Sequence, residues 1–135
     1  MTVPLSGGNP VQFASASMNS TIRHMAVWGA QIYWIENGRD GTRGRLMTAD
    51  ARGEKRGTLT MLPEGSVMGM AADDRFVYWT SQEPKSVFKV SVAGGVPTTV
   101  ALDQAWPYEI VVDESRVYWT NREGEDVVAS RPRSE

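Results

Sequence analysis

Val77-Tyr78-Trp79-Thr80 is the most informative segment of the chain, because it occurs three times. It returns as Val117-Tyr118-Trp119-Thr120 and, in a looser copy, as Ile32-Tyr33-Trp34-Ile35. The three tryptophans are 45 and then 40 residues apart, and a pair of small or β-branched residues precedes each copy. A repeat of about 40 residues is typical of β-propellers, in which each repeat forms one blade of four strands.

The second repeat illustrates the strand pattern. Runs of β-branched and aromatic residues alternate with turns rich in Gly, Pro, Asp and Ser, which is the signature of short strands. No stretch shows a helical period of 3.6, and 13 glycines and 7 prolines interrupt the chain. The predicted strands of this repeat are Gly69–Ala72, Phe76–Ser81, Val87–Val92 and Thr98–Leu102. We therefore predict an all-β fold of four-stranded antiparallel blades, with about three blades per chain.

Composition limits the class of protein. The chain has 135 residues, a net charge of -2 and no cysteine. This length suits one domain, and the charge argues against a nucleic-acid binder that works by neutralising phosphates. The lack of cysteine excludes disulfides and thiolate metal sites. No apolar run is long enough to predict a membrane span. Residues 1–10 do not resemble a signal peptide, so the compartment stays open, and an exported bacterial parent is one alternative.

The repeats divide the single domain unevenly. We predict blade 1 at residues 20–62, blade 2 at 66–102 and an incomplete blade 3 at 106–135, with 1–15 completing a neighbouring blade. Blade 3 lacks a fourth strand, and Val11–Ala14 supplies one at the other end of the chain. Two copies would then close a six-bladed ring, each completing the last blade of the other. Alternatively, the chain is part of a longer propeller.

A second repeated block complicates this closure. Val3-Pro4-Leu5-Ser6-Gly7-Gly8-Asn9-Pro10 matches Val90-Ser91-Val92-Ala93-Gly94-Gly95-Val96-Pro97. Val3–Leu5 and Arg131–Arg133 therefore both look like a third strand of the closing blade. The sequence does not decide which of the two is used.

The segment Asp113-Glu114-Ser115-Arg116-Val117-Tyr118-Trp119-Thr120-Asn121 resembles the repeat of the YWTD family of six-bladed propellers, including its bacterial relatives. The resemblance implies six blades and a role in binding proteins or other ligands rather than in catalysis. Two departures concern aspartates: Trp28 replaces the turn Asp of the first repeat, and the last Asp of the motif is replaced in every copy by Glu36, Ser81 or Asn121. We interpret the repeated aromatic residues as blade-packing residues, namely Tyr33, Trp34, Tyr78, Trp79, Tyr118 and Trp119.

Candidate binding residues follow from the repeat alignment. The starts of the innermost strands would meet at the mouth of a central channel, which the alignment assigns to Arg23, His24, Met68, Tyr108 and Glu109. The blade-connecting loop adds Trp106, an aromatic side chain suited to stacking on a peptide or sugar. The glycine-rich segment Glu36–Arg45, with Arg39 and Arg43, is predicted to be an exposed basic loop.

Three functions remain open on these grounds. The preferred one is a non-enzymatic binding or scaffold module acting through the loop face, with a protein or carbohydrate ligand. The second is a propeller-type hydrolase or lyase using a metal at His24 and Glu109. The third is an assembly unit without a ligand. We assign no catalytic residue or metal ligand and predict no cofactor, although Ca²⁺ is possible because acidic pairs occur. Asp73-Asp74 and Asp113-Glu114 fall at equivalent turns, where Asp caps its own backbone.

Overall fold

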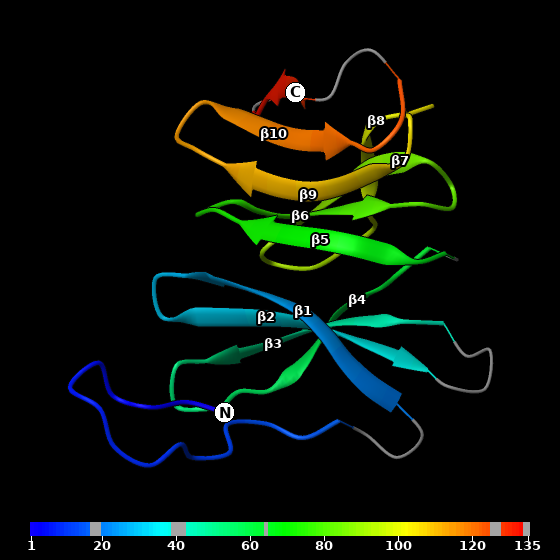
Figure 1. The fold of residues 1–135 in the computed structure, drawn as a ribbon. Coiled ribbons are helices and arrows are strands. Elements are labelled where there is room, and N and C mark those ends of the chain that lie inside the picture. The colour runs from blue at the N-terminus through cyan, green and yellow to red at the C-terminus, as the bar shows by residue number, and fades with distance from the viewer. Residues whose placement is uncertain (17–19, 39–42, 64, 125–127, 134–135) are drawn as a thin grey trace.

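The computed structural model describes residues 1–16, 20–38, 43–63, 65–124 and 128–133. All regular structure in these residues is β-strand (Figure 1). The part of the chain that the structure describes contains no helix long and apolar enough to cross a membrane. The strands are β1 (Ser20–Trp28), β2 (Gln31–Gly38), β3 (Arg45–Asp50), β4 (Gly57–Met61), β5 (Val67–Ala72), β6 (Phe76–Ser81), β7 (Ser86–Ser91), β8 (Thr98–Ala101), β9 (Pro107–Val112), β10 (Arg116–Asn121) and β11 (Val128–Pro132).

These strands form three antiparallel sheets in chain order. The first two sheets are β1-β2-β3-β4 and β5-β6-β7-β8, and the third has β9, β10 and β11. Each sheet corresponds to one predicted blade, so the all-β, propeller-type fold is confirmed. In the second blade the observed strands differ from the predicted ones by at most two residues at either end.

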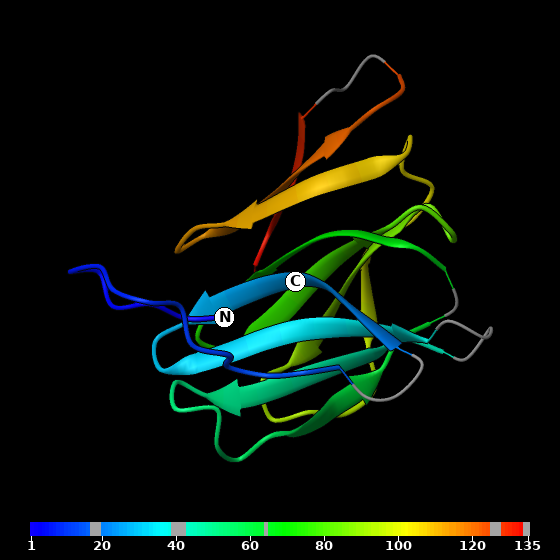
Figure 2. The same cartoon turned by 60° about the horizontal axis from the view of Figure 1, so that its bottom comes forward.

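The sheets lie side by side, with the second between the other two (Figures 1 and 2). The first strands of the blades, β1, β5 and β9, pack next to each other in that order. This is the position of the innermost strands of a propeller. All three carry an irregularity near their beginning, where the pairing with the next strand shifts register.

The repeated Tyr-Trp pair holds neighbouring blades together from both sides. Adjacent side chains on a strand point to opposite faces. Trp79 therefore packs toward blade 1, in the same cluster as Tyr33, while Tyr78 packs toward blade 3, in the same cluster as Trp119. Tyr33 likewise faces the following blade and Trp119 the preceding one. Trp34 instead packs against Phe13, and Tyr118 lines an open hollow on blade 3.

The turn aspartates also act as predicted. Asp73 Oδ1 accepts hydrogen bonds from the backbone N–H groups of Arg75 and Phe76, at 2.7 and 2.8 Å. Asp113 Oδ1 accepts the equivalent bonds from Ser115 and Arg116, at 2.7 and 2.8 Å. Such bonds fix a tight turn through the side chain of its first residue.

Two expectations about the ends and the first loop need correction. Val11–Ala14 is not a strand; instead Val11 forms an isolated bridge with Thr2. Glu36 does not belong to an exposed loop, because it lies in β2 and is almost completely buried. Arg45 likewise begins β3. The loop between β2 and β3 is therefore shorter than predicted, and Arg39 lies outside the described residues.

Candidate functional site

The blade-connecting loops and the loops between second and third strands lie on one face of the molecule. The backbone N–H of Gln104 donates to the carbonyl of Lys85 at 2.8 Å. The N–H of Arg122 donates to the carbonyl of Trp106 at 3.0 Å, and that of Glu123 to the carbonyl of Ala105 at 3.1 Å. These bonds tie three loops from two blades into one surface, which we call the loop face.

Trp106 is the central aromatic residue of the loop face. Its backbone has a φ of 60°, a left-handed conformation that non-glycine residues seldom adopt. The Lys85 ammonium lies 5.0 Å from the centre of its ring, within the range of a cation–π interaction. Trp106 lines a pocket of about 270 Å³ together with Arg122 and Glu123. The pocket thus combines an aromatic wall with charges of both signs.

Tyr108 and Glu109 follow Trp106 on β9, and Glu109 lines a hollow on the open face of blade 3. The Arg122 guanidinium lies 5.1 Å from the centre of the Tyr108 ring. The carbonyl of Tyr108 accepts a hydrogen bond from the Thr80 hydroxyl of blade 2. The backbone N–H of Glu109 donates to the hydroxyl of Thr120 at 3.1 Å. Two threonines from adjacent blades therefore fix the start of this inner strand.

The backbone approach at this point depends on Gly69. A Cβ atom at Gly69 would lie 2.7 Å from the carbonyl oxygen of Tyr108 and 3.3 Å from the Cα atom of Glu109. Only a residue without a side chain allows β5 and β9 to come so close. The inner strands of blades 2 and 3 are therefore in direct contact where the predicted channel mouth lies.

The remaining predicted channel residues are on the inner strands, but they do not form one cluster. Arg23 is exposed, and His24 occupies the bulge of β1 with a φ of 47°. Met68 occupies the bulge of β5. Glu109 lies on β9, and β5 separates that strand from β1 (Figure 1). A site shared by His24 and Glu109 stays a prediction.

Metal binding also stays a prediction. Within the described ranges, no group of three or more His, Asp or Glu side chains could hold a metal ion. The single histidine, His24, has no acidic residue close to it in the sequence.

An unpredicted buried cluster surrounds Glu36. Its carboxylate pairs with Arg45 at 2.8 Å and with Arg56 at 3.2 Å, and it accepts a hydrogen bond from the Trp34 indole at 3.2 Å. The Arg56 guanidinium also lies 5.3 Å from the centre of the Trp34 ring. Arg56 lies twenty residues from Glu36 in the sequence, and the β3–β4 hairpin brings the two side chains into direct contact. Arg43, the other predicted basic residue, donates from Nε to the carbonyl of Leu62 at 3.2 Å.

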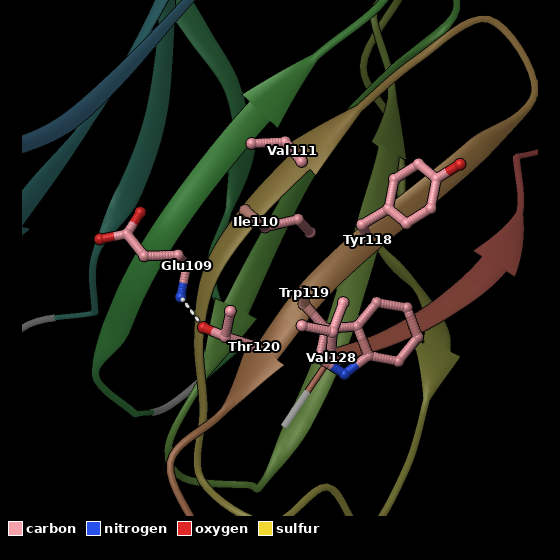
Figure 3. A pocket seen from close by; sticks show the side chains of 7 residues that line it. All are labelled: Glu109, Ile110, Val111, Tyr118, Trp119, Thr120 and Val128. Atoms are coloured by element: carbon pink, nitrogen blue, oxygen red, sulfur yellow. Dashed lines mark hydrogen bonds between the residues drawn. The ribbon is translucent and has the colours of Figure 1, made fainter. Parts of the chain in front are cut away.

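Two apolar blade faces are open at the ends of the arc. Among the residues that line them, the sequence analysis interpreted Trp34 and Tyr118 as blade-packing residues and Glu109 as a channel residue. On blade 3, a shallow pocket of about 130 Å³ is lined by Val111, Tyr118 and Val128, among others (Figure 3). On blade 1, a second hollow of about 80 Å³ is lined by Met25, Trp34 and Phe13, among others. The alternation of side chains along β1 and β9 was the signal from which the residues of these faces could have been predicted. Every second residue of such a strand must face away from the neighbouring blade.

The open faces are equivalent to buried surfaces elsewhere in the chain. Met25 and Val27 are 60% and 56% exposed, although the corresponding Met70 and Ala72 pack between blades 1 and 2. Val111 is 62% exposed, although the corresponding Ala71 packs between blades 2 and 3. Each open face therefore carries the strand positions that form a blade–blade interface elsewhere in the chain.

The fold and the blade geometry define a β-propeller-type repeat protein. A chain of a solved nidogen/laminin complex is similar to this one, with a TM-score of 0.66 and 19% identity. The match covers 84% of this chain and 48% of the other, so this chain spans about half of its structural neighbour. The likeness supports a YWTD-like β-propeller fold. No protein-family model matches the sequence, and no curated protein matches it either.

Proposed function

We propose that the chain is a non-enzymatic binding module of the YWTD propeller type that recognises other proteins through its loop face. The observation that carries this proposal is the Trp106 pocket, in which an aromatic ring lies among Lys85, Arg122 and Glu123. Aromatic residues and arginines are enriched among the residues that dominate protein interfaces. The structural neighbour, which was solved in a nidogen/laminin complex, agrees with a binding role.

The test is binding to an array of synthetic peptides of defined sequence, followed by titration of the best peptide. Trp106→Ala should weaken that binding by about tenfold or more, because one anchoring aromatic contributes at least ~1.4 kcal/mol. Trp28→Ala is the matched control, since Trp28 is a half-exposed tryptophan at the end of β1, next to the β1–β2 turn and outside the loops that form the loop face. Equal binding by the two variants, or no peptide bound above background, would contradict the proposal.

We also propose that the module is a ring of six blades made from two copies. The open face of blade 3, with Val111, Tyr118 and Val128, would pack on the partner's open face of blade 1, with Met25 and Trp34. This pairing repeats the relation of Tyr78 to Trp119 inside the chain. Burying these exposed apolar side chains supplies the driving force.

Native mass tests this assembly. Light scattering on a sizing column should give about twice the chain mass of 14.9 kDa in a single folded peak. Val111→Glu should shift the peak to the monomer, because it buries a charge in the closing interface. Glu114→Lys is a control on the exposed β9–β10 turn. A folded wild-type monomer would exclude the dimeric ring.

A further inference from the structure

The N-terminal segment has the form of the outer half of a blade. Gly7 donates a backbone hydrogen bond to Pro4 at 2.9 Å, as Gly94 does to Ser91 at 2.9 Å in the turn between β7 and β8. Thr2 pairs with Val11, and the matching residues of blade 2, Lys89 and Thr98, also pair. The repeated sequence block therefore keeps not only its turn but also its strand register.

The same correspondence holds for side-chain packing. In the repeat alignment Phe13 and Ala14 match Val100 and Ala101 of β8. Val100 and Ala101 pack in the cluster that contains Trp119, the tryptophan of the following blade. Phe13 and Ala14 pack in the cluster that contains Trp34, the tryptophan of blade 1, and the Phe13 ring meets the Trp34 ring edge-on at 6.3 Å. Residues 11–14 thus already occupy the place of a fourth strand before blade 1.

Two different segments match the third-strand position that pairs with Val11. By register, Thr2 matches Lys89 as the third-strand partner of this fourth strand. Ser130 matches Lys89 equally, because Tyr118 pairs with Ser130 as Tyr78 pairs with Lys89. A fourth strand has only one neighbour, so Thr2 and the partner's Ser130 exclude each other.

Strand pairing and burial favour β11 over the Thr2 segment as the neighbour of residues 11–14. It pairs with β10 over five consecutive residues, whereas Thr2 holds Val11 through a single bridge. The residues preceding Ser6 also bury little: Met1 is 76% exposed and Leu5 is fully exposed. Displacing them costs little apolar surface, while β11 has a free edge that a strand would satisfy.

We propose that residues 11–14 of each copy exchange Thr2 for β11 of the other copy, with Val11 opposite the partner's Ser130 and Ala14 opposite the partner's Val128. The pair of Ala14 with Val128 is equivalent to the observed pair of Ala101 with Val87 in blade 2. The exchange rests on the dimeric ring proposed above and specifies its contact. In it, residues 1–5 leave the blade and β11 serves as the third strand.

The absence of cysteine makes site-directed crosslinking a direct test. A Val11→Cys chain is mixed with a Ser130→Cys chain under mild oxidation, and crosslinked dimer is measured on a non-reducing gel. The mixed pair should crosslink about fivefold more than Gln12→Cys with Ser130→Cys, since residue 12 points to the other face of the strand. Mixing Ala14→Cys with Val128→Cys provides a second pair, in case substitution at Ser130 disturbs its bonds to Arg116.

The outcomes separate the exchange from the dimer. A dimer by light scattering in which neither mixed pair crosslinks above the Gln12 control would overturn the exchange and leave the ring intact. The exchange would also be overturned if a Thr2→Cys, Val11→Cys chain closed its internal disulfide fully within the dimer peak. A monomer would overturn both. Thr2→Pro removes a hydrogen bond only from the displaced segment, so it should leave the dimer fraction unchanged or raise it; a loss of dimer would count against the exchange.

Discussion

The hydroxyl of Tyr78 donates a hydrogen bond of 3.0 Å to Asp73 Oδ2 inside the protein. The same bond recurs between Tyr118 and Asp113 at 2.9 Å, at a more exposed position. In blade 2 the aspartate also pairs with Arg133, at 3.4 Å, and so links the turn to the end of β11. Tyr78 therefore holds the turn of its own blade through its hydroxyl while its ring packs against blade 3.

Removing this hydroxyl should cost more in blade 2 than in blade 3. We expect Tyr78→Phe to lower the free energy of unfolding by about 1–3 kcal/mol, because Asp73 is buried and loses a donor. Tyr118→Phe should lower it less, since water can replace the lost bond at the exposed Asp113. Urea unfolding of the two variants measures the difference, and equal losses would contradict the role assigned to burial.

The pKa of Asp113 predicts a response to acid. Hydrogen bonds from the backbone of Ser115 and Arg116, and from the Tyr118 hydroxyl, lower the pKa of Asp113 to about 2. A lowered pKa in the folded state means that the stabilising contribution is present above the unfolded pKa of about 4 and disappears as the pH falls through about 2. NMR titration of the Asp113 carboxyl should show this low midpoint, and Ser115→Pro, which removes both the backbone N–H and the hydroxyl donor of Ser115, should raise it. A midpoint near 4 in the unaltered protein would refute the assignment.

Gly69 should not accept a side chain. Its Cβ would meet the backbone of Tyr108 and Glu109, which cannot move without shifting β9. We expect Gly69→Ala to cost about 1–3 kcal/mol of stability. Gly57→Ala is the matched control, because a Cβ at Gly57 meets nothing within 4 Å. Equal denaturation midpoints for the two variants would contradict the close approach of β5 and β9.

The buried carboxylate of Glu36 should be sensitive to loss of charge. Glu36→Gln keeps the shape but removes the negative partner of Arg45 and Arg56. Hydrogen bonds to charged groups contribute about 1.5–3 kcal/mol each, and the partly exposed arginines reduce this, so we expect a loss of about 2 kcal/mol. Glu54→Gln, at an exposed position between β3 and β4, should change the stability by less than about 0.5 kcal/mol. The importance of this cluster is disproved if both variants unfold at the same urea concentration.

The blades were predictable from the sequence because their signals are local. The bounds of β6 were predicted to the residue, since alternating β-branched and aromatic side chains next to an Asp turn specify both the strand and its two faces. The turn-capping role of Asp73 and Asp113 followed in the same way, because the bonds involved span only two or three residues. The repeat then extended these assignments to blades with weaker signals.

Contacts between residues that are distant in the sequence could not be predicted from it. The burial of Glu36 depends on Arg56, twenty residues away, which the β3–β4 hairpin returns to the same place. The Trp106 pocket depends on Arg122 and Glu123 from the next hairpin of blade 3, and the Arg133–Asp73 pair depends on how blade 3 stacks on blade 2.

The order of residues along the chain was sufficient to specify the all-β fold, the number of blades and the alternation of tyrosine and tryptophan between them. Two features emerged from the folded arrangement alone: Phe13 and Ala14 pack against Trp34, and Thr2 occupies a position matching that of Ser130. The reason is that a period of two residues is encoded in the chain itself. The stacking of sheets and the choice between competing strands depend instead on which surfaces meet in space.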